Sequence, residues 1–383
     1  MNSFDQVLNR RLEVLREKGL RRELRRVDSA QGTRIKIGGK TLLNFSSNDY
    51  LGLANHPALR EAAIMAVEKF GAGAGASRLI CGSLAPFHEL EEALAAFKAT
   101  EAALTFSTGY AAAIGTIGSL LSKGDIIILD KLVHACILDA AKLSGATLRV
   151  YDHNALEDLE KILKWSAKQR TADTQVLVVT ESVFSMDGDT APLREIVALK
   201  DQYGAWLMLD EAHATGLYGK NRRGLAEELG VSDRIEIQMG TLGKALGASG
   251  GFICGSRRLI DFLINRARSF IFSTAPVPAA AAAATAALHF VQSDSGKARR
   301  DSLWQRCKQF NANCVSAIHP LIIGDESKAV ELAARLRSQG IHIPAIRYPT
   351  VARGAARLRV TLTAGHSAED VAGLLIALNA LSP

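Results

Sequence analysis

Two apolar runs decide the fold of this chain: VLVVTE at residues 176–181 and WLMLDE at residues 206–211. Both are short and rich in aliphatic side chains, as expected of buried strands. IIILD at residues 126–130 and GGFICG at residues 250–255 have the same character. Because helical patterns separate these runs, the order predicts an α/β fold with a mainly parallel sheet flanked by helices.

The remaining chain divides into an arm and a smaller domain around this sheet. Residues 1–45 form the expected N-terminal arm, with a basic amphipathic helix over residues 4–27 followed by a hairpin. We expect a large cofactor-binding domain over residues 46–278. A linking helix and a small α+β C-terminal domain are expected over residues 279–383.

Bulk composition favours a globular protein of the cytoplasm. The chain has 383 residues, of which 48% are hydrophobic and 22% charged. We expect no secretory signal and no membrane span, since no stretch approaches the roughly 20 apolar residues that cross a bilayer. The net charge of +7 comes without a basic run interleaved with aromatic residues beyond the first helix, so nucleic-acid binding is not indicated. The cysteines are scattered and odd in number, which fits reduced thiols: Cys81, Cys136, Cys254, Cys307 and Cys314.

The segment TLGKALGASGG at residues 241–251 places Lys244 among small side chains, which let a flat cofactor approach the backbone. A lysine amine with a lowered pKa forms a Schiff base, and the hydroxyl of Thr241 is suited to bind a phosphate of the same cofactor. Taken alone, the segment favours a surface lysine in a glycine-rich loop, so the interpretation needs partner residues elsewhere in the chain.

A second segment, LDEAHATG at residues 209–216, places a carboxylate at a strand end and a histidine three positions later. Ligands bind at the carboxyl ends of parallel strands. Asp210 is suited to pair with a protonated ring nitrogen and His213 to bond a ring hydroxyl. A helix-capping Asp210 and a structural His213 are the alternative. Metal ligation is disfavoured because no other ligands lie nearby.

Two further segments complete the candidate site. In TFSTGYAA at residues 105–112, Gly109 and Tyr110 begin a helix, where free amides bind phosphate. No nucleotide P-loop motif surrounds them. His134 follows the strand at residues 126–130 and is placed either to stack on a flat ring or to pack in the core.

These segments, together with NFSSNDYLG at residues 44–52, ESVFSMDGD at residues 181–189 and RLRVTLT at residues 357–363, resemble the α-oxoamine synthase family of fold-type I pyridoxal-phosphate (PLP) enzymes. The resemblance covers essentially the whole chain and implies a large domain with a seven-stranded sheet. It also implies a PLP-dependent C-acyltransferase. The implied cofactor-binding residues are Gly109, Tyr110, His134, Ser185, Asp210, His213, Thr241, Lys244, Ser273 and Thr274.

Within that resemblance, Lys244, His134 and Asp210 are the implied catalytic residues. Ser273 and Thr274 match residues that reach the phosphate from a partner subunit, which implies a homodimer with shared sites. Arg359 matches the position that grips the amino-acid carboxylate, a task suited to a guanidinium fork. The implied substrate-binding residues are Arg21, Asn48, His134, Thr350 and Arg359.

Within that resemblance, weaker markers imply the substrates. Arg21, PLIIGD at residues 320–325 and AIRYPT at residues 345–350 resemble the relatives that join L-alanine to pimeloyl-CoA or a pimeloyl carrier protein, a step in biotin biosynthesis. Relatives that join glycine to acetyl-CoA or succinyl-CoA, or serine to palmitoyl-CoA, carry the same cofactor motifs. An aminotransferase of the same fold and a non-catalytic partner subunit remain as alternatives, although Lys244, Asp210 and His213 argue against the latter.

Overall fold

The computed structural model describes residues 3–380, which form two compact units. The larger unit comprises residues 51–185 and 189–301, and the smaller comprises residues up to 50, residues 186–188 and residues from 302 onward. Each is described by itself. No helix within residues 3–380 has the length and apolar character needed to cross a membrane.

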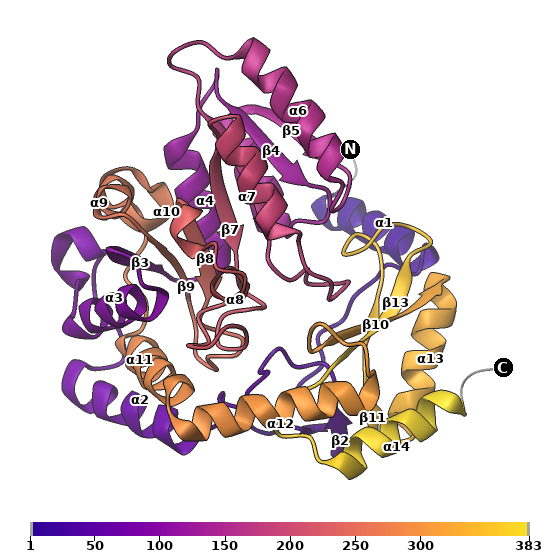
Figure 1. Cartoon of the computed structure of the whole chain (residues 1–383). Coiled ribbons are helices and arrows are strands. Elements are labelled where there is room, and N and C mark those ends of the chain that lie inside the picture. The colour runs from indigo at the N-terminus through magenta and orange to yellow at the C-terminus, as the bar shows by residue number, and fades with distance from the viewer. Residues whose placement is uncertain (1–2, 381–383) are drawn as a thin grey trace. The chain divides into compact units, whose positions relative to one another are not determined.

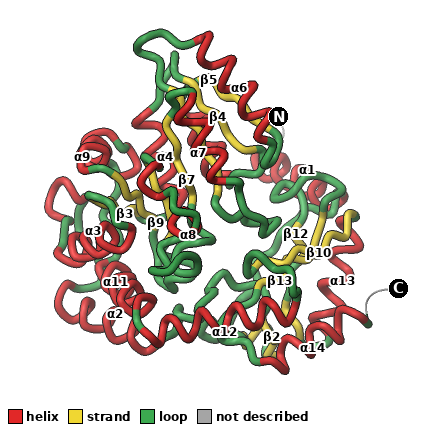
Figure 2. Tube along the Cα trace, in the orientation of Figure 1, coloured by secondary structure: helices red, strands yellow, loops and turns green. Residues whose placement is uncertain are grey.

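The larger unit contains a seven-stranded sheet of order β3-β9-β8-β7-β6-β4-β5 (Figures 1 and 2). Strands β4 to β8 run parallel to one another, and β9 is antiparallel to both β3 and β8. The expected α/β fold with a mainly parallel seven-stranded sheet is therefore confirmed. Its strands are β3 (Ala102–Phe106), β4 (Ile126–Asp130), β5 (Thr147–Tyr151), β6 (Val176–Glu181), β7 (Trp206–Asp210), β8 (Ile237–Thr241) and β9 (Gly251–Gly255).

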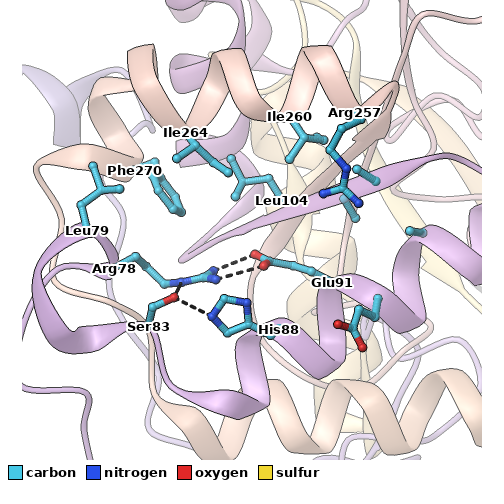
Figure 3. Close-up of a pocket in the computed structure, with 14 residues that line it drawn as sticks. Arg78, Leu79, Ser83, His88, Glu91, Leu104, Arg257, Ile260, Ile264 and Phe270 are labelled. Carbon is cyan, nitrogen blue, oxygen red and sulfur yellow. Dashed lines mark hydrogen bonds and ion pairs between the residues drawn. The ribbon is translucent and has the colours of Figure 1, made fainter.

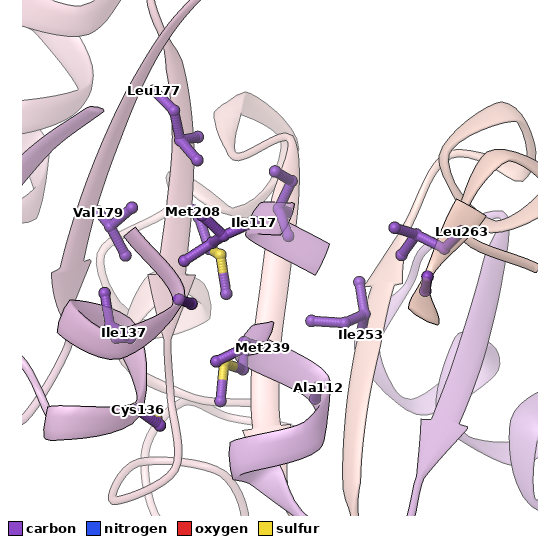
Figure 4. Packing of buried hydrophobic residues seen from close by; sticks show 14 of the residues in the cluster. Ala112, Ile117, Cys136, Ile137, Leu177, Val179, Met208, Met239, Ile253 and Leu263 are labelled. Atoms are coloured by element: carbon purple, nitrogen blue, oxygen red, sulfur yellow. The ribbon is translucent and has the colours of Figure 1, made fainter. Parts of the chain in front are cut away.

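Helices cover both faces of this sheet. On one face α4, α5, α9 and α10 bury aliphatic side chains against the strands, among them Ile117, Ile137 and Leu263 (Figure 4). On the other face α6 and α7 pack on β4, β5 and β7. The helices of the larger unit are α2 (Pro57–Phe70), α3 (Ala85–Lys98), α4 (Gly109–Leu120), α5 (Ala135–Ser144), α6 (Leu156–Gln169), α7 (Leu193–Gln202), α8 (Leu225–Glu228), α9 (Arg257–Arg266), α10 (Arg268–Ile271) and α11 (Pro278–Gln292), with short helices η1 (Arg78–Gly82) and η2 (Ser232–Arg234).

Glycine at one position of β9 brings the sheet against the first turn of α4. A Cβ atom on Gly251 would lie 2.6 Å from the Cα atom of Gly109. Any side chain there would push the start of α4 away from the strand, because real Cβ atoms do not approach this closely. Gly251 therefore fixes where the free amides at the start of α4 stand relative to β8 and β9.

The smaller unit contains two three-stranded sheets. One has the order β1-β2-β11, with β1 and β2 forming the expected hairpin and β11 parallel to β2. The other is antiparallel, with the order β10-β13-β12. The elements are α1 (Phe4–Glu17), β1 (Arg34–Ile37), β2 (Lys40–Asn44), α12 (Asp294–Phe310, which starts in the larger unit), β10 (Ile318–Gly324), α13 (Glu326–Ser338), β11 (Ile341–His342), β12 (Ala345–Ile346), β13 (Ala356–Thr361) and α14 (Ala368–Asn379).

Two features differ from the expectations drawn from the sequence. The expected helix over residues 4–27 ends at Glu17, because Gly19 adopts a left-handed φ of 63° and its amide bonds back to Arg16. The expected boundary at residue 278 also differs from the division into compact units, which falls after residue 301. Helix α11 packs on α2 and α3, so it belongs with the larger unit.

Candidate active site

The carboxyl ends of the central strands gather most of the predicted cofactor residues at one edge of the sheet. Asp210 ends β7, and it pairs in register with Glu181, which ends β6. His134 follows β4, Ser185 follows β6, and Lys244 follows β8. Parallel strands present their carboxyl ends along one edge, where α/β folds bind ligands.

Lys244 lies in direct contact with another predicted residue. Its Nζ atom is 2.7 Å from Nε2 of His213, which is buried with 5% of its surface exposed. Thr241, at the end of β8, donates its hydroxyl to the carbonyl of Gly250 at 3.0 Å and accepts the amide of Gly243 at 3.2 Å. These bonds fold the segment after β8 into a tight loop that presents the lysine amine.

Asp210 is a buried carboxyl, with 5% of its surface exposed. One of its oxygens accepts the amide of Ala212 at 2.8 Å. Burial raises the pKa of Asp210, while the positive charge of Lys244 and the hydrogen bond from the amide of Ala212 act in the opposite direction. A cation placed beside this carboxyl would therefore stabilise its ionised form, which is the property needed to hold a protonated ring nitrogen.

His134 caps the start of α5. Its Nδ1 atom accepts the amide of Cys136 at 3.3 Å, and the thiol of Cys136 lies 3.0 Å from the same atom. Desolvation lowers the pKa of His134, with Asp210 opposing and Lys244 reinforcing that shift. The imidazole is thus neutral near pH 7, since its ordinary pKa is 6.5. A neutral ring is suited to stacking on a flat cofactor.

The start of α4 supplies backbone amides. Thr108 caps the helix by accepting the amide of Ala111 at 3.0 Å, which leaves the first-turn amides at Gly109 and Tyr110 to face outward. Tyr110 is 47% exposed, and its hydroxyl donates to Asp139 at 2.7 Å. A helix start with free amides is an anion site when other groups of the same ligand are held nearby.

Ser273 and Thr274 lie on a separate segment before α11. Thr274 forms a bridge with Ser77, and the amide of Ala275 donates to the carbonyl of Ala76 at 3.0 Å. Ser185, in contrast, is buried with 8% of its surface exposed, in the loop after β6. The structure therefore places Ser185 with the strand-end residues and Ser273 and Thr274 on another segment of the same unit.

The predicted substrate residues other than His134 lie in the smaller unit. Arg359, on β13, is buried and donates to Oδ1 of Asn48 at 3.1 Å and to the hydroxyl of Thr361 at 2.8 Å. Arg21 and Thr350 lie on neighbouring exposed segments, because Arg347 donates to the carbonyl of Arg21 at 2.9 Å. The structure thus brings Arg359 and Asn48 into contact.

A histidine between two aspartates is a feature for which no role was predicted from the sequence. His153 contacts Asp130 through Nδ1 at 2.9 Å and Asp189 through Nε2 at 2.7 Å. The two carboxylates raise the pKa of His153 to about 10 despite its partial burial. The three residues come from distant segments, so no local motif identifies this network.

We expect His153→Gln to destabilise the fold by roughly 1–2 kcal/mol near neutral pH, since it breaks two charge-assisted contacts. The folded pKa of about 10 lies above the ordinary value of 6.5. The stabilisation is therefore fully present below about pH 6.5 and is lost as the pH rises through about 10. Urea unfolding of both proteins at several pH values measures this difference, and a constant difference across that range would contradict it.

One cavity in the larger unit lies apart from these residues. It has a volume of about 330 Å³, and its lining contains none of the predicted site residues (Figure 3). Arg78 forms a bidentate pair with Glu91 at 2.7 and 3.0 Å, and Ser83 contacts His88 at 2.9 Å. Glu91 also accepts the amide and hydroxyl of Thr105 on β3. Through these bonds to Thr105, Glu91 connects α3 to the sheet.

Comparison with known proteins identifies the family of the chain. Residues 40–378 match the family model for class I and II aminotransferases. The 8-amino-7-oxononanoate synthase of Anaeromyxobacter dehalogenans is 48% identical over 382 residues, covering 97% of this chain and 94% of that protein.

Solved structures of PLP enzymes from the same family also resemble this chain. Serine palmitoyltransferase from S. paucimobilis, with a bound PLP–myriocin aldimine, has a TM-score of 0.91 at 29% identity and covers 98% of this chain and 96% of that chain. The 8-amino-7-oxononanoate synthase of Francisella tularensis has a TM-score of 0.74 at 28% identity and covers 88% of this chain and 97% of that chain.

The chain belongs to the class I and II aminotransferase family of PLP enzymes and, within it, to the 8-amino-7-oxononanoate synthases. The predictions of a PLP-dependent acyltransferase and of its cofactor are confirmed. The residues fit that cofactor, because a lysine amine, a buried carboxyl and a helix start with free amides stand at the ends of adjoining elements.

Proposed function

We propose that this chain condenses L-alanine with pimeloyl-CoA or a pimeloyl carrier protein in the cytoplasm, as a step of biotin biosynthesis. The α-carbon of alanine bonds to the thioester carbonyl carbon, the thiol leaves, and the alanine carboxylate departs as carbon dioxide. The product is 8-amino-7-oxononanoate. The observation that carries the proposal is the contact of 2.7 Å between Lys244 and His213, at the sheet edge that holds buried Asp210.

The residue roles follow from this arrangement. PLP, when bound, is an electron sink for charge that develops at the α-carbon of the amino acid. Lys244 would hold the cofactor and then remove the α-proton with its freed amine, a task that His213 supports by fixing the position of Nζ. Asp210 would hold the proton of the ring nitrogen. His134 would stack on the ring and assist the acyl or proton steps.

Phosphate and polar-edge contacts complete the proposed cofactor site. Amides of Gly109 and Tyr110 at the start of α4 and the hydroxyl of Thr241 would hold the phosphate. Ser185 would bind the polar edge of the ring. Its position in the loop after β6, at the same sheet edge as Asp210 and Lys244, supports that role.

We further propose that two copies of the chain form a homodimer, in which Ser273 and Thr274 reach the phosphate of the partner subunit. The segments that contain Ser77 and Thr274 are joined by a β-bridge between these two residues. Both segments carry exposed apolar side chains close to the bridge in the sequence. They are Leu79, Ile80, Phe272 and Val277, which are 48–79% exposed. Sedimentation should give twice the chain mass of 41.0 kDa, and a monomer would overturn this proposal.

The function is tested by mixing the PLP-loaded protein with L-alanine and pimeloyl-CoA or pimeloyl carrier protein. Free thiol and product mass are followed together. Alanine-dependent thiol release with formation of 8-amino-7-oxononanoate would support the proposal. Thiol release only with glycine or serine and another acyl-CoA would overturn the substrates and keep the reaction type. Transfer of the amino group to a keto acid without thiol release would overturn both.

Arg359 is proposed to bind the alanine carboxylate, supported by its burial and its contact with Asn48. We expect Arg359→Lys to raise the KM for alanine by about 10- to 100-fold, because lysine cannot form a bidentate pair. Arg357, two residues earlier on β13, pairs with Asp187 at 2.7 Å and gives a matched control. Steady-state kinetics should show Arg357→Lys within about threefold of wild type; equal effects of both changes would contradict the assignment.

A further inference from the structure

A second cavity in the larger unit has a lining that contains none of the residues assigned to the cofactor. Its volume is about 420 Å³, which suits a small organic ligand better than a single ion. Helices α3 and α11 pack side by side and contribute Phe97 and Leu288 to an apolar wall (Figure 1). Arg222 and Arg223, in the loop between β7 and α8, line it together with His289. The cavity therefore combines an apolar wall with a cationic one.

Arg222 is a buried arginine with few partners. It is 8% exposed, and its guanidinium forms one hydrogen bond in the part of the chain that the structure describes, to the carbonyl of Gln292 at 2.7 Å. Its Nε atom is buried and has no partner there. The charged groups that act on it from nearby are Arg300, Asp294, Asp301 and Glu227. None of these carboxylates bonds to its guanidinium among the described residues. A buried charge of this kind is costly unless a counter-ion binds to it.

The side chain of Arg223 also lacks a partner. Its guanidinium forms no hydrogen bond or ion pair within the described chain, and its Nε atom is buried. The backbone of Arg223 is held instead, because its amide donates to Glu227 at 3.0 Å and its carbonyl accepts Nζ of Lys98 at 2.6 Å. The amide of Arg222 donates to the carbonyl of Gly219 at 3.2 Å. Main-chain bonds thus hold this loop largely without the two guanidinium groups, whose remaining donors can bind a ligand.

The backbone of Arg222 is strained as well. Its φ of 63° lies in the left-handed region, which costs free energy for any residue with a Cβ atom. The single bond from its side chain to a carbonyl does not neutralise the buried charge that this conformation places at the cavity. Strained residues of this kind cluster at sites that bind ligands. The conformation of Arg222 therefore supports a binding role for the cavity that it lines.

We propose that this cavity binds a phosphate monoester: the guanidinium groups of Arg222 and Arg223 hold the phosphate, and the organic part of the ligand lies against Phe97 and Leu288. A dianionic phosphate matches two positive charges, and guanidinium groups donate in the geometry that phosphate oxygens accept. The site does not depend on PLP or on the substrates proposed above. Its phosphate belongs either to a separate metabolite or to an acyl-CoA, and the test distinguishes these sources.

Isothermal titration calorimetry with phenyl phosphate tests the site. The protein is the borohydride-reduced holoenzyme, in which the phosphate of the attached cofactor occupies the catalytic site. The wild type should bind phenyl phosphate with a Kd of about 1 mM or lower. Benzoate has the ring but a single negative charge, so it should bind at least about fivefold more weakly. Absence of phenyl phosphate binding, or equal binding of benzoate, would overturn the proposal.

Two variants locate the binding in this cavity. Arg222→Gly and Arg223→Gln should each weaken phenyl phosphate binding by at least about tenfold, since each removes charge-assisted bonds. Glycine suits the left-handed backbone, so Arg222→Gly should retain the urea midpoint of unfolding or raise it, which separates loss of binding from loss of fold. Arg258→Gln is the matched control, because Arg258 is exposed on α9 and does not line the cavity; it should bind as the wild type does. Wild-type affinity in both cavity variants would overturn the proposal.

Coenzyme A distinguishes the two sources of the phosphate. If saturating coenzyme A displaces phenyl phosphate from the wild type, the cavity holds a phosphate group of the acyl-CoA. If phenyl phosphate still binds, the cavity serves a separate phosphorylated metabolite. Both outcomes support a phosphate site at Arg222 and Arg223.

Discussion

Lys244→Ala should abolish alanine-dependent thiol release, with a fall of at least about 10³-fold in kcat. The lysine amine is proposed to serve twice, first as the attachment point of the cofactor and then as the base that takes the α-proton, and general-base catalysis alone contributes about 10²- to 10⁴-fold. The Nζ atom of Lys244 lies 2.7 Å from Nε2 of His213, and alanine at this position supplies no amine to take its place.

The measurement combines thiol release with borohydride reduction and peptide mass. Reduction should attach PLP to the wild-type peptide that contains Lys244 and should leave the variant unlabelled. Lys220→Ala is a suitable control, because Lys220 is exposed on the loop that follows His213. It should retain wild-type activity within about twofold. If Lys244→Ala retains more than a tenth of the wild-type rate, Lys244 is not the base.

The strands could be predicted from the sequence because each is an aliphatic run bounded by polar residues. VLVVTE and IIILD became β6 and β4 with the expected bounds, since strands buried on both faces have no polar face to interrupt the run. The strand ends then located Asp210, His134 and Lys244 together. Parallel topology does this without any contact information, because it places every carboxyl end at one edge.

The surroundings of Glu181 and His153 could not be found in this way. Glu181 lies within a predicted strand end, but nothing in the local sequence shows that its oxygen lacks a partner or that Asp210 is its neighbour. His153 draws its partners from segments 23 and 36 residues away. The prediction of a helix over residues 4–27 was wrong because the left-handed Gly19 ends the helix, although the charge and apolar pattern continues beyond it. The periodicity of a sequence reports neither pairing between distant segments nor single residues in the left-handed region.

Asp210→Asn should lower kcat/KM by about 10²- to 10³-fold, the second largest effect that we expect. An amide cannot carry the negative charge that holds a proton on the ring nitrogen, and without that proton the ring is a weaker electron sink. Cofactor affinity should also fall, because the buried side chain no longer offsets a positive ring. The fold should remain, since the asparagine oxygen can still accept the amide of Ala212 at the distance of 2.8 Å seen here.

The experiment separates charge from shape. Absorption spectra of the bound cofactor across pH should show the ring nitrogen losing its proton at lower pH in Asp210→Asn than in the wild type, because a carboxylate raises the pKa of a neighbouring cation. Asp152→Asn is the matched control, since Asp152 also follows a strand of the same sheet but is exposed and pairs with Lys131 at 2.9 Å. That variant should react as the wild type does. Activity of Asp210→Asn within tenfold of wild type, with an unchanged spectrum, would mean that another group holds the ring proton, and Glu181 at the neighbouring strand end would be the first to test.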